Sequence, residues 1–187
     1  MKNVIKYPGL SCLLGIACFA ILLSASLLAY GSSDSIHVQI RGTIFATSCQ
    51  VDIPQDVNLG QISRQDLSVP GGNSSTMVVL LKLSQCSPEV SQATVSFTGS
   101  PYTADPAFSS AIYANEASGG ATDIGLQLFN LDGNALVNLA NGVNYSFPVQ
   151  TTTHAGVLSI GARMYSPHGT PTAGDFKAAV TVNFTYQ

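Results

Sequence analysis

The stretch Gly174-Asp-Phe-Lys-Ala-Ala-Val-Thr-Val-Asn-Phe-Thr-Tyr-Gln187 ends the sequence and decides its fold. Apolar side chains occupy every second position, and mostly polar ones lie between them. A two-residue period predicts a β-strand with one apolar face. A strand this long and regular either closes a sheet or presents one of its edges. The apolar positions are Phe176, Ala178, Val180, Val182, Phe184 and Tyr186.

The first 31 residues have the pattern of a secretory signal. Lys2 and Lys6 precede an apolar run over residues 10–28, and Ala29-Tyr30-Gly31 offers a small-x-small cleavage site. Such a run can also anchor a helix in a membrane, since about 20 apolar residues suffice. Ala, Ser, Gly and Cys dilute this run, which favours a cleaved signal. We therefore expect an exported mature chain that begins near Ser32.

Removal of the signal leaves about 156 residues, enough for one domain with a hydrophobic core. Cys49 and Cys86 then remain as the only pair of cysteines, and a disulfide is the default expectation in an exported protein. Basic residues in this part number five against ten acidic ones. The mild negative charge argues against nucleic acid and anionic lipid as partners.

Short alternating or apolar runs fill the rest of the mature chain, separated by clusters of Gly, Pro, Asn and Ser. This pattern predicts an all-β sandwich of the immunoglobulin-like kind, in a single domain. The expected strands cover residues 45–53, 76–86, 92–99, 123–130, 143–150, 156–166 and 174–186.

A second alternating segment precedes Cys49. Its apolar residues, and one glycine, occupy even positions up to residue 44, whereas the apolar residues from Phe45 to Ile53 occupy odd positions. Because a one-residue slip turns every side chain to the opposite face, residues 36–44 and 45–53 do not fit one flat strand. A β-bulge explains the change if the segment packs on its own domain. A peptide that leaves its domain to pack elsewhere explains it equally well.

This order of features resembles the chaperone-usher pilus subunits, and among them the type 1 fimbrial family. A signal, a short alternating segment containing Ile40-Arg41-Gly42 and two cysteines 37 positions apart precede the final strand. That strand has Tyr186 next to last and Gly174 fourteenth from the end. The stretch Asp123-Ile-Gly-Leu-Gln-Leu-Phe129 is also similar to the central strand of the family. The chain has no room for the second domain of a tip adhesin.

The resemblance implies an incomplete immunoglobulin-like sandwich that lacks its final strand and keeps an open apolar groove. In this family a periplasmic chaperone fills the groove first, and the amino-terminal segment of the next subunit then replaces it, a form of β-augmentation. The chain then divides into signal 1–31, donor extension 32–44 and pilin domain 45–187. The donor positions are Ile36, Val38, Ile40, Gly42 and Ile44. The receiving, chaperone-binding edge is Gly174, Phe176, Ala178, Val180, Val182, Phe184 and Tyr186.

The same resemblance implies the partners and the location of the protein. We expect a periplasmic chaperone, an outer-membrane usher and neighbouring subunits as partners. The product would be a fimbrium on the cell surface that supports bacterial adhesion.

The residues do not indicate an enzyme or a cofactor site. His37, His154 and His168 are isolated, and none has a second ligand at metal-binding spacing. Gly156-Val-Leu-Ser159-Ile-Gly161 is one residue too long for a nucleophile elbow. We therefore predict no catalytic residue, metal, cofactor or small-molecule substrate.

A stand-alone secreted sandwich that binds carbohydrate or protein is the alternative interpretation. Residues 36–44 would then form its own first strand. The loop-rich region 100–120 contains Tyr102, Phe108 and Tyr113, which could form a sugar-contacting surface. Aromatic residues in loops also pack against their own domain, so this reading stays open.

Overall fold

A computed structural model describes Gln39, Arg41, residues 48–133 and residues 136–187. The chain divides into two units, Met1–Thr43 and Ile44–Gln187, and the fold below is that of the second. The predicted signal and the five donor positions lie outside the described residues. Within the described ranges, no helix is long and apolar enough to span a membrane.

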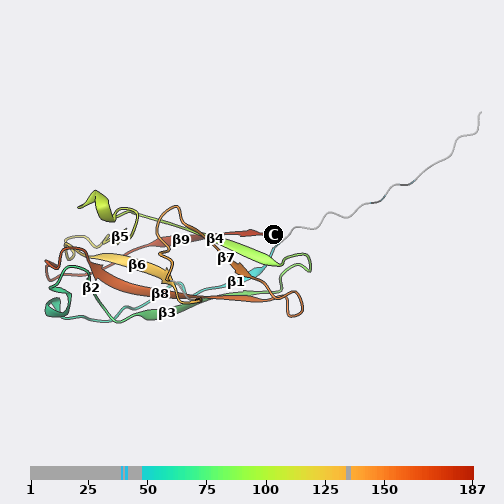
Figure 1. Cartoon of the computed structure of the whole chain (residues 1–187), viewed down its shortest axis with the longest axis horizontal. Coiled ribbons are helices and arrows are strands. Elements are labelled where there is room, and N and C mark those ends of the chain that lie inside the picture. Colours follow the sequence, from blue (N-terminus) through green and yellow to red (C-terminus); the bar gives the residue numbers. More distant parts are fainter. Residues whose placement is uncertain (1–38, 40, 42–47, 134–135) are drawn as a thin grey trace, which may run out of the picture. The chain divides into compact units, whose positions relative to one another are not determined.

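The described residues of this unit form two β-sheets and two short 3-10 helices (Figure 1). The larger sheet has the strand order β1-β3-β8-β6-β5, with β2 also pairing β8, and the smaller sheet has the order β7-β4-β9. All the ladders are antiparallel. The elements are β1 (Gln50–Asp52), η1 (Arg64–Leu67), β2 (Gly72–Asn73), β3 (Met77–Ser84), β4 (Gln92–Gly99), η2 (Pro106–Phe108), β5 (Tyr113–Ala114), β6 (Gly125–Asn130), β7 (Asn144–Pro148), β8 (Gly156–Ser166) and β9 (Val180–Tyr186).

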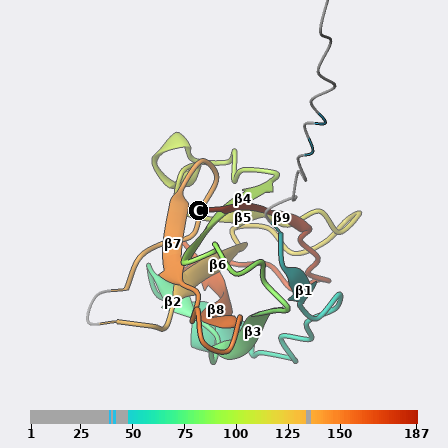
Figure 2. The same ribbon diagram turned by 90° about the vertical axis from the view of Figure 1, so that its right-hand side faces the viewer.

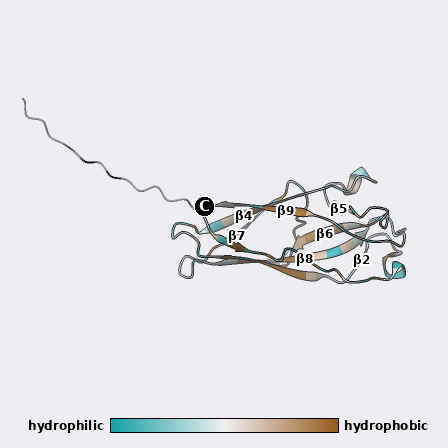
Figure 3. Ribbon diagram, turned by 180° about the vertical axis from the view of Figure 1, so that it is seen from behind, coloured by the Kyte–Doolittle hydropathy of each residue, from teal (hydrophilic) through white to brown (hydrophobic). Residues whose placement is uncertain are grey.

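The hydrophobic core lies between the two sheets. Alternate residues of β3, β4 and β8 point inward, and Leu81, Val95 and Leu158 are completely buried. Brown, hydrophobic segments accordingly run along β6 and β8 in Figure 3. The two-residue period of these strands thus becomes one apolar layer, as the sequence predicts for an all-β sandwich.

The predicted disulfide between Cys49 and Cys86 is confirmed. It joins the residue before β1 to the end of β3, and the two Cα atoms are 4.0 Å apart. Cys86 is buried within the core. The bond therefore links the start of β1 to the chain two residues beyond β3, the strand with which β1 pairs.

Each of the seven predicted strands corresponds to an observed one, but the last is shorter than expected. The ladder of β9 begins at Val180, which pairs with Gly99, the last residue of β4. Residues 174–179 therefore extend beyond the end of their partner strand. The two-residue strands β2 and β5 are too short to show a periodic pattern, and the sequence does not predict them.

The sandwich is incomplete along one side. β9 pairs only with β4, and β1 pairs only with β3, within the described part of the chain. Figure 2 looks along the strands and places β9 and β1 on the same side of the domain. The immunoglobulin-like sandwich that lacks a strand, predicted from the sequence, is confirmed.

Candidate functional site

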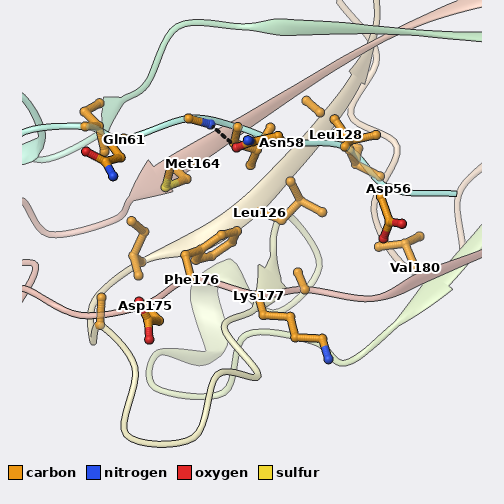
Figure 4. Close-up of a pocket in the computed structure, with 18 of the residues that line it drawn as sticks. Asp56, Asn58, Gln61, Leu126, Leu128, Met164, Asp175, Phe176, Lys177 and Val180 are labelled. Carbon is orange, nitrogen blue, oxygen red and sulfur yellow. Dashed lines mark hydrogen bonds between the residues drawn. The ribbon is translucent and has the colours of Figure 1, made fainter. Parts of the chain in front are cut away.

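An open groove of about 950 Å³ runs along this incomplete side. Residues 53–62 with Arg64 form one wall, and residues 171–178 with Val180 and Val182 form the other. The floor is the hydrophobic core itself: Val79, Phe97, Leu126, Leu128, Ile160, Ala162 and Met164 line it, and all are buried. In Figure 4, Phe176 points into the groove between Leu126 and Met164.

The wall that leads into β9 carries the alternating residues predicted from the sequence. Each of its apolar side chains is only partly buried, whereas the polar residues between them are exposed. Asp175 and Lys177 point away from the groove in Figure 4. A strand with one completed apolar face would bury these positions, as β3 and β4 do. The partly buried positions are Phe176, Ala178, Val180, Val182, Phe184 and Tyr186.

The opposite wall has no regular secondary structure. Ile53, Leu59 and Ile62 are half-buried, and the Asn58 side chain accepts a hydrogen bond of 2.8 Å from the Gly60 backbone N–H. No backbone hydrogen bond joins residues 53–62 to another described residue. Both walls therefore leave backbone donors and acceptors free, which an added strand can use.

Asn115 holds the segment 175–177 from behind. Its side-chain amide donates to the carbonyl oxygens of Ala121 at 2.8 Å and Asp175 at 2.9 Å. Its side-chain oxygen accepts from the Lys177 backbone N–H at 2.9 Å. Two backbone bonds lie beside it, from Ala121 N–H to the Asp175 carbonyl and from Glu116 N–H to the Lys177 carbonyl. These contacts replace the ladder that β4 no longer supplies.

Asp123 holds the chain between β8 and this wall. Its carboxylate accepts hydrogen bonds from the Thr170 backbone N–H at 2.8 Å, the Thr170 hydroxyl at 2.9 Å and the Ser166 hydroxyl at 3.0 Å. His168 bridges two carboxylates, with Nδ1 2.7 Å from Asp123 and Nε2 3.0 Å from Asp105. The loops before η2 and β6 are thereby joined to the end of β8.

The ionisation of this cluster follows from its hydrogen bonds. Burial alone would raise the pKa of Asp123, but hydrogen bonds from His168, Thr170 and Ser166 outweigh it and lower the pKa to about 2. The hydrogen bonds to Asp123 and Asp105 raise the pKa of His168 above its usual value. Asp123 is therefore a carboxylate throughout the neutral range, and His168 carries a proton more readily than a free histidine.

Gly174 lies where the second wall meets the loop 115–121. A Cβ atom on this residue would be 2.6 Å from the Ala121 backbone nitrogen, closer than non-bonded atoms can approach. A glycine is therefore required for the wall to lie this close to the loop.

Two of the three aromatic residues considered for a sugar surface are in the core. Tyr102 and Tyr113 are 5% and 1% exposed, and the Tyr113 hydroxyl donates to the Leu139 carbonyl at 2.8 Å. Phe108 packs its ring edge-on against His168 at 5.6 Å between centroids. The proposed aromatic surface is therefore wrong, because the rings fill space inside their own domain. Among the described residues, no group of three His, Cys, Asp or Glu side chains could hold a metal ion.

The sequence predicts the alternating wall but not the opposite wall or the polar support. Residues 53–62 show no alternation, and Asn115 lies in a loop-rich region. Asp123 was predicted within the strand 123–130, but that strand, β6, begins at Gly125. Asp123 adopts a left-handed backbone conformation, with φ of 52°, which only the structure reveals. Gly119-Gly120 is the sequence feature that could have indicated this support, because a Cβ atom on Gly120 would be 2.5 Å from the Asp175 carbonyl oxygen.

The groove can accept an extended apolar peptide. It offers a hydrophobic floor, partly exposed side chains at strand spacing on one wall, and unpaired backbone groups on both walls. These are the requirements for binding by strand addition. A groove of this kind is also an exposed apolar edge, which promotes aggregation while it stays empty.

Comparisons with known proteins agree on one family. A family model described as "Fimbrial protein" matches residues 38–187. The type-1 fimbrial protein A chain of Escherichia coli strain K12 is 28% identical over 168 residues, covering 88% of this chain and 90% of the relative. The fimbrial subunit type 1 of Klebsiella pneumoniae is 26% identical over 182 residues, covering 93% and 97%. The crystal structure of the P pilus rod subunit PapA matches with a TM-score of 0.57 and 21% identity, covering 74% of this chain and 99% of that one.

Proposed function

The chain belongs to the fimbrial protein family, and we propose that its groove receives the amino-terminal strand of a neighbouring subunit. It is a structural subunit of a surface fimbria. In the proposed assembly, residues 36–44 leave their own domain and fill the groove of the next molecule, so that each subunit is both donor and acceptor. The single observation that carries this proposal is the open apolar groove beside β9.

The chemistry of the donor matches that of the groove. Ile36, Val38, Ile40 and Ile44 fall at the two-residue spacing of the apolar wall. Burying each of them contributes about 1.5 to 3 kcal/mol before ordering costs. Unpaired backbone groups on the two walls supply hydrogen bonds to the added strand, and its alternating side chains fix the register.

The empty groove would be hazardous during export. A subunit in transit exposes the floor and both walls, and such a surface invites edge-to-edge association. We infer that a periplasmic chaperone covers the groove until assembly, and that an outer-membrane usher is the site of the exchange.

Gly42 provides the sharpest test of this proposal. It interrupts the apolar positions of the donor, and we expect its place in the groove to be too shallow for a side chain. Gly42→Leu should therefore still form a chaperone complex but should not enter fibres. The matched control is Thr43→Leu, which adds a similar side chain on the opposite face of the same strand.

The measurement is the amount of each variant in the chaperone complex and in isolated fibres. The proposal fails if Gly42→Leu enters fibres as well as Thr43→Leu does. A monodisperse monomer that stays soluble after deletion of residues 32–44 would instead favour the stand-alone binding module.

A further inference from the structure

We infer that Asn115 and Asp123 are positioning residues for the acceptor groove: they hold the wall 171–178, and the turn 166–170 that leads into it, in the receiving position while the groove is empty. This inference rests on the proposed function. It adds a role for two residues that line neither the floor nor the walls.

The hydrogen bonds of Asn115 select which backbone groups face the groove. In an extended chain, the backbone groups of alternate residues point to opposite sides. Asn115 and its neighbours bond the carbonyl of Asp175 and both backbone groups of Lys177 on the side of the loop 115–121. The backbone groups of Phe176 then point to the other side, where a donor strand would lie.

Asp123 fixes the other end of the same wall. Three of its hydrogen bonds reach Ser166, the last residue of β8, and Thr170, four residues later. The residue before Asp123, Thr122, donates its backbone N–H to the Thr172 hydroxyl oxygen at 2.9 Å. The wall is thus tied to the segment 115–123 at residues 172, 175 and 177, and the turn that leads into it is tied at residues 166 and 170.

An empty groove needs such support, because the hydrophobic effect acts to close it. Phe176, Ala178 and Val180 are partly exposed across from Leu59 and Ile62, and moving the walls together would bury all five. The polar ties oppose that movement. A groove that stays open binds a strand without the free-energy cost of reopening, and this raises the rate of capture.

The support also depends on pH. His168 faces the carboxylates of Asp105 and Asp123 and the ring of Phe108, and Tyr102 reaches the same Asp123 carboxylate at 3.3 Å. A protonated His168 donates to both carboxylates. As the pH rises above the raised pKa of His168, one of those two hydrogen bonds loses its donor, and the tie weakens.

The test measures capture of a fluorescent peptide with the sequence of residues 36–44 by the full mature chain, freshly refolded, using fluorescence anisotropy. The peptide carries His37→Gln, so that it does not titrate itself. The variants are Asn115→Ala and Asp123→Asn, and the matched control is Ser146→Ala. Ser146 loses a 2.7 Å hydroxyl contact with Thr94 on the outer face of the smaller sheet, far from the groove lining.

We expect both variants to capture the peptide about tenfold more slowly, since each loses hydrogen bonds worth about 1.4 kcal/mol or more. Ser146→Ala should match the wild type. Wild-type capture should slow as the pH rises through the raised pKa of His168, and Asp123→Asn should flatten that dependence. If Asp123 only stabilised the fold, the pH dependence of the capture rate would be the same in the wild type and in Asp123→Asn.

A second measurement tests the positioning role if either variant folds too poorly for the capture assay. In the chain with a second copy of residues 32–44 fused after Gln187, the donor itself helps to hold the wall, so Asp123→Asn should lower the unfolding temperature less there than it does in the unfused chain. If both variants capture the peptide as fast as the wild type does, the positioning role is wrong and the proposed function stands. If the wild type captures no peptide, both fall.

Discussion

Fusing a second copy of Ser32 to Ile44 behind Gln187 through a flexible linker should complete the domain. The fused segment can fold back into the groove, so the chain becomes its own donor. Burial of Ile36, Val38, Ile40 and Ile44 contributes roughly 6 to 12 kcal/mol, and each ladder hydrogen bond adds about 1 kcal/mol. Ordering nine residues costs about 1 to 2 kcal/mol each. With about eight ladder bonds, the middle of these ranges leaves a net gain of about 3 kcal/mol in the free energy of unfolding.

Urea and thermal unfolding followed by circular dichroism measure this gain. For a chain of this length, about 3 kcal/mol corresponds to a rise of about 6 to 12 °C in Tm. The control carries the same fusion with Val38→Ser and Ile40→Ser in the added copy, which keeps the length and removes two buried side chains. Equal midpoints for the fused chain, its control and the unfused chain would refute the reasoning, because the groove would then have no preference for the donor.

Three further predictions concern single features of the domain. Phe176→Ala should reduce the stability gained from the fused donor by about 2 kcal/mol, since Phe176 forms the middle of the wall. The control Lys177→Ala should leave that gain unchanged, because the Lys177 side chain points away from the groove. Equal losses of stability for the two variants in urea unfolding would contradict the groove geometry. Reduction of the Cys49–Cys86 bond should lower the free energy of unfolding by about 4 kcal/mol on the chain-entropy estimate. Urea unfolding with and without reductant measures this loss, and an unchanged midpoint would contradict the prediction. The pKa of Asp123 is lowered to about 2, so its contribution to stability should be complete above about pH 4 and be lost as the pH falls toward 2. Asp123→Asn should therefore show a shallower acid unfolding transition than the wild type. Identical acid transitions would rule out this contribution.

The sequence predicts the strands of this fold well where the two-residue alternation continues over many residues. Residues 176–186 have an apolar residue at every even position and β4 alternates in the same way, so which face each strand buries follows from the two-residue period. In β3 the first five residues are all apolar, and only the structure shows that Met77, Val78 and Leu80 are exposed. The prediction was wrong over residues 174–179, because the length of a ladder depends on the partner strand. Nothing in the sequence of β9 reveals that β4 ends at Gly99.

The groove was harder to predict than the strands. Its irregular wall, residues 53–62, has no periodic pattern, and the support by Asn115 and Asp123 depends on contacts between residues about 45 to 60 positions apart. Such polar contacts leave no local signal. Tyr102 and Tyr113 show the reverse error: a loop-rich sequence suggested exposed aromatic rings, but Tyr113 lies in β5, paired with β6, and both rings are buried.

The exchange of strands between molecules can be measured directly in fibres assembled from two labelled pools. One pool of subunits carries ¹³C and the other ¹⁵N, and solid-state NMR detects contacts between the two labels. Contacts between residues 36–44 of one pool and Val180–Tyr186 of the other are the predicted result. Contacts of these segments only within a single pool, undiminished when that pool is diluted with unlabelled subunits, would contradict the account.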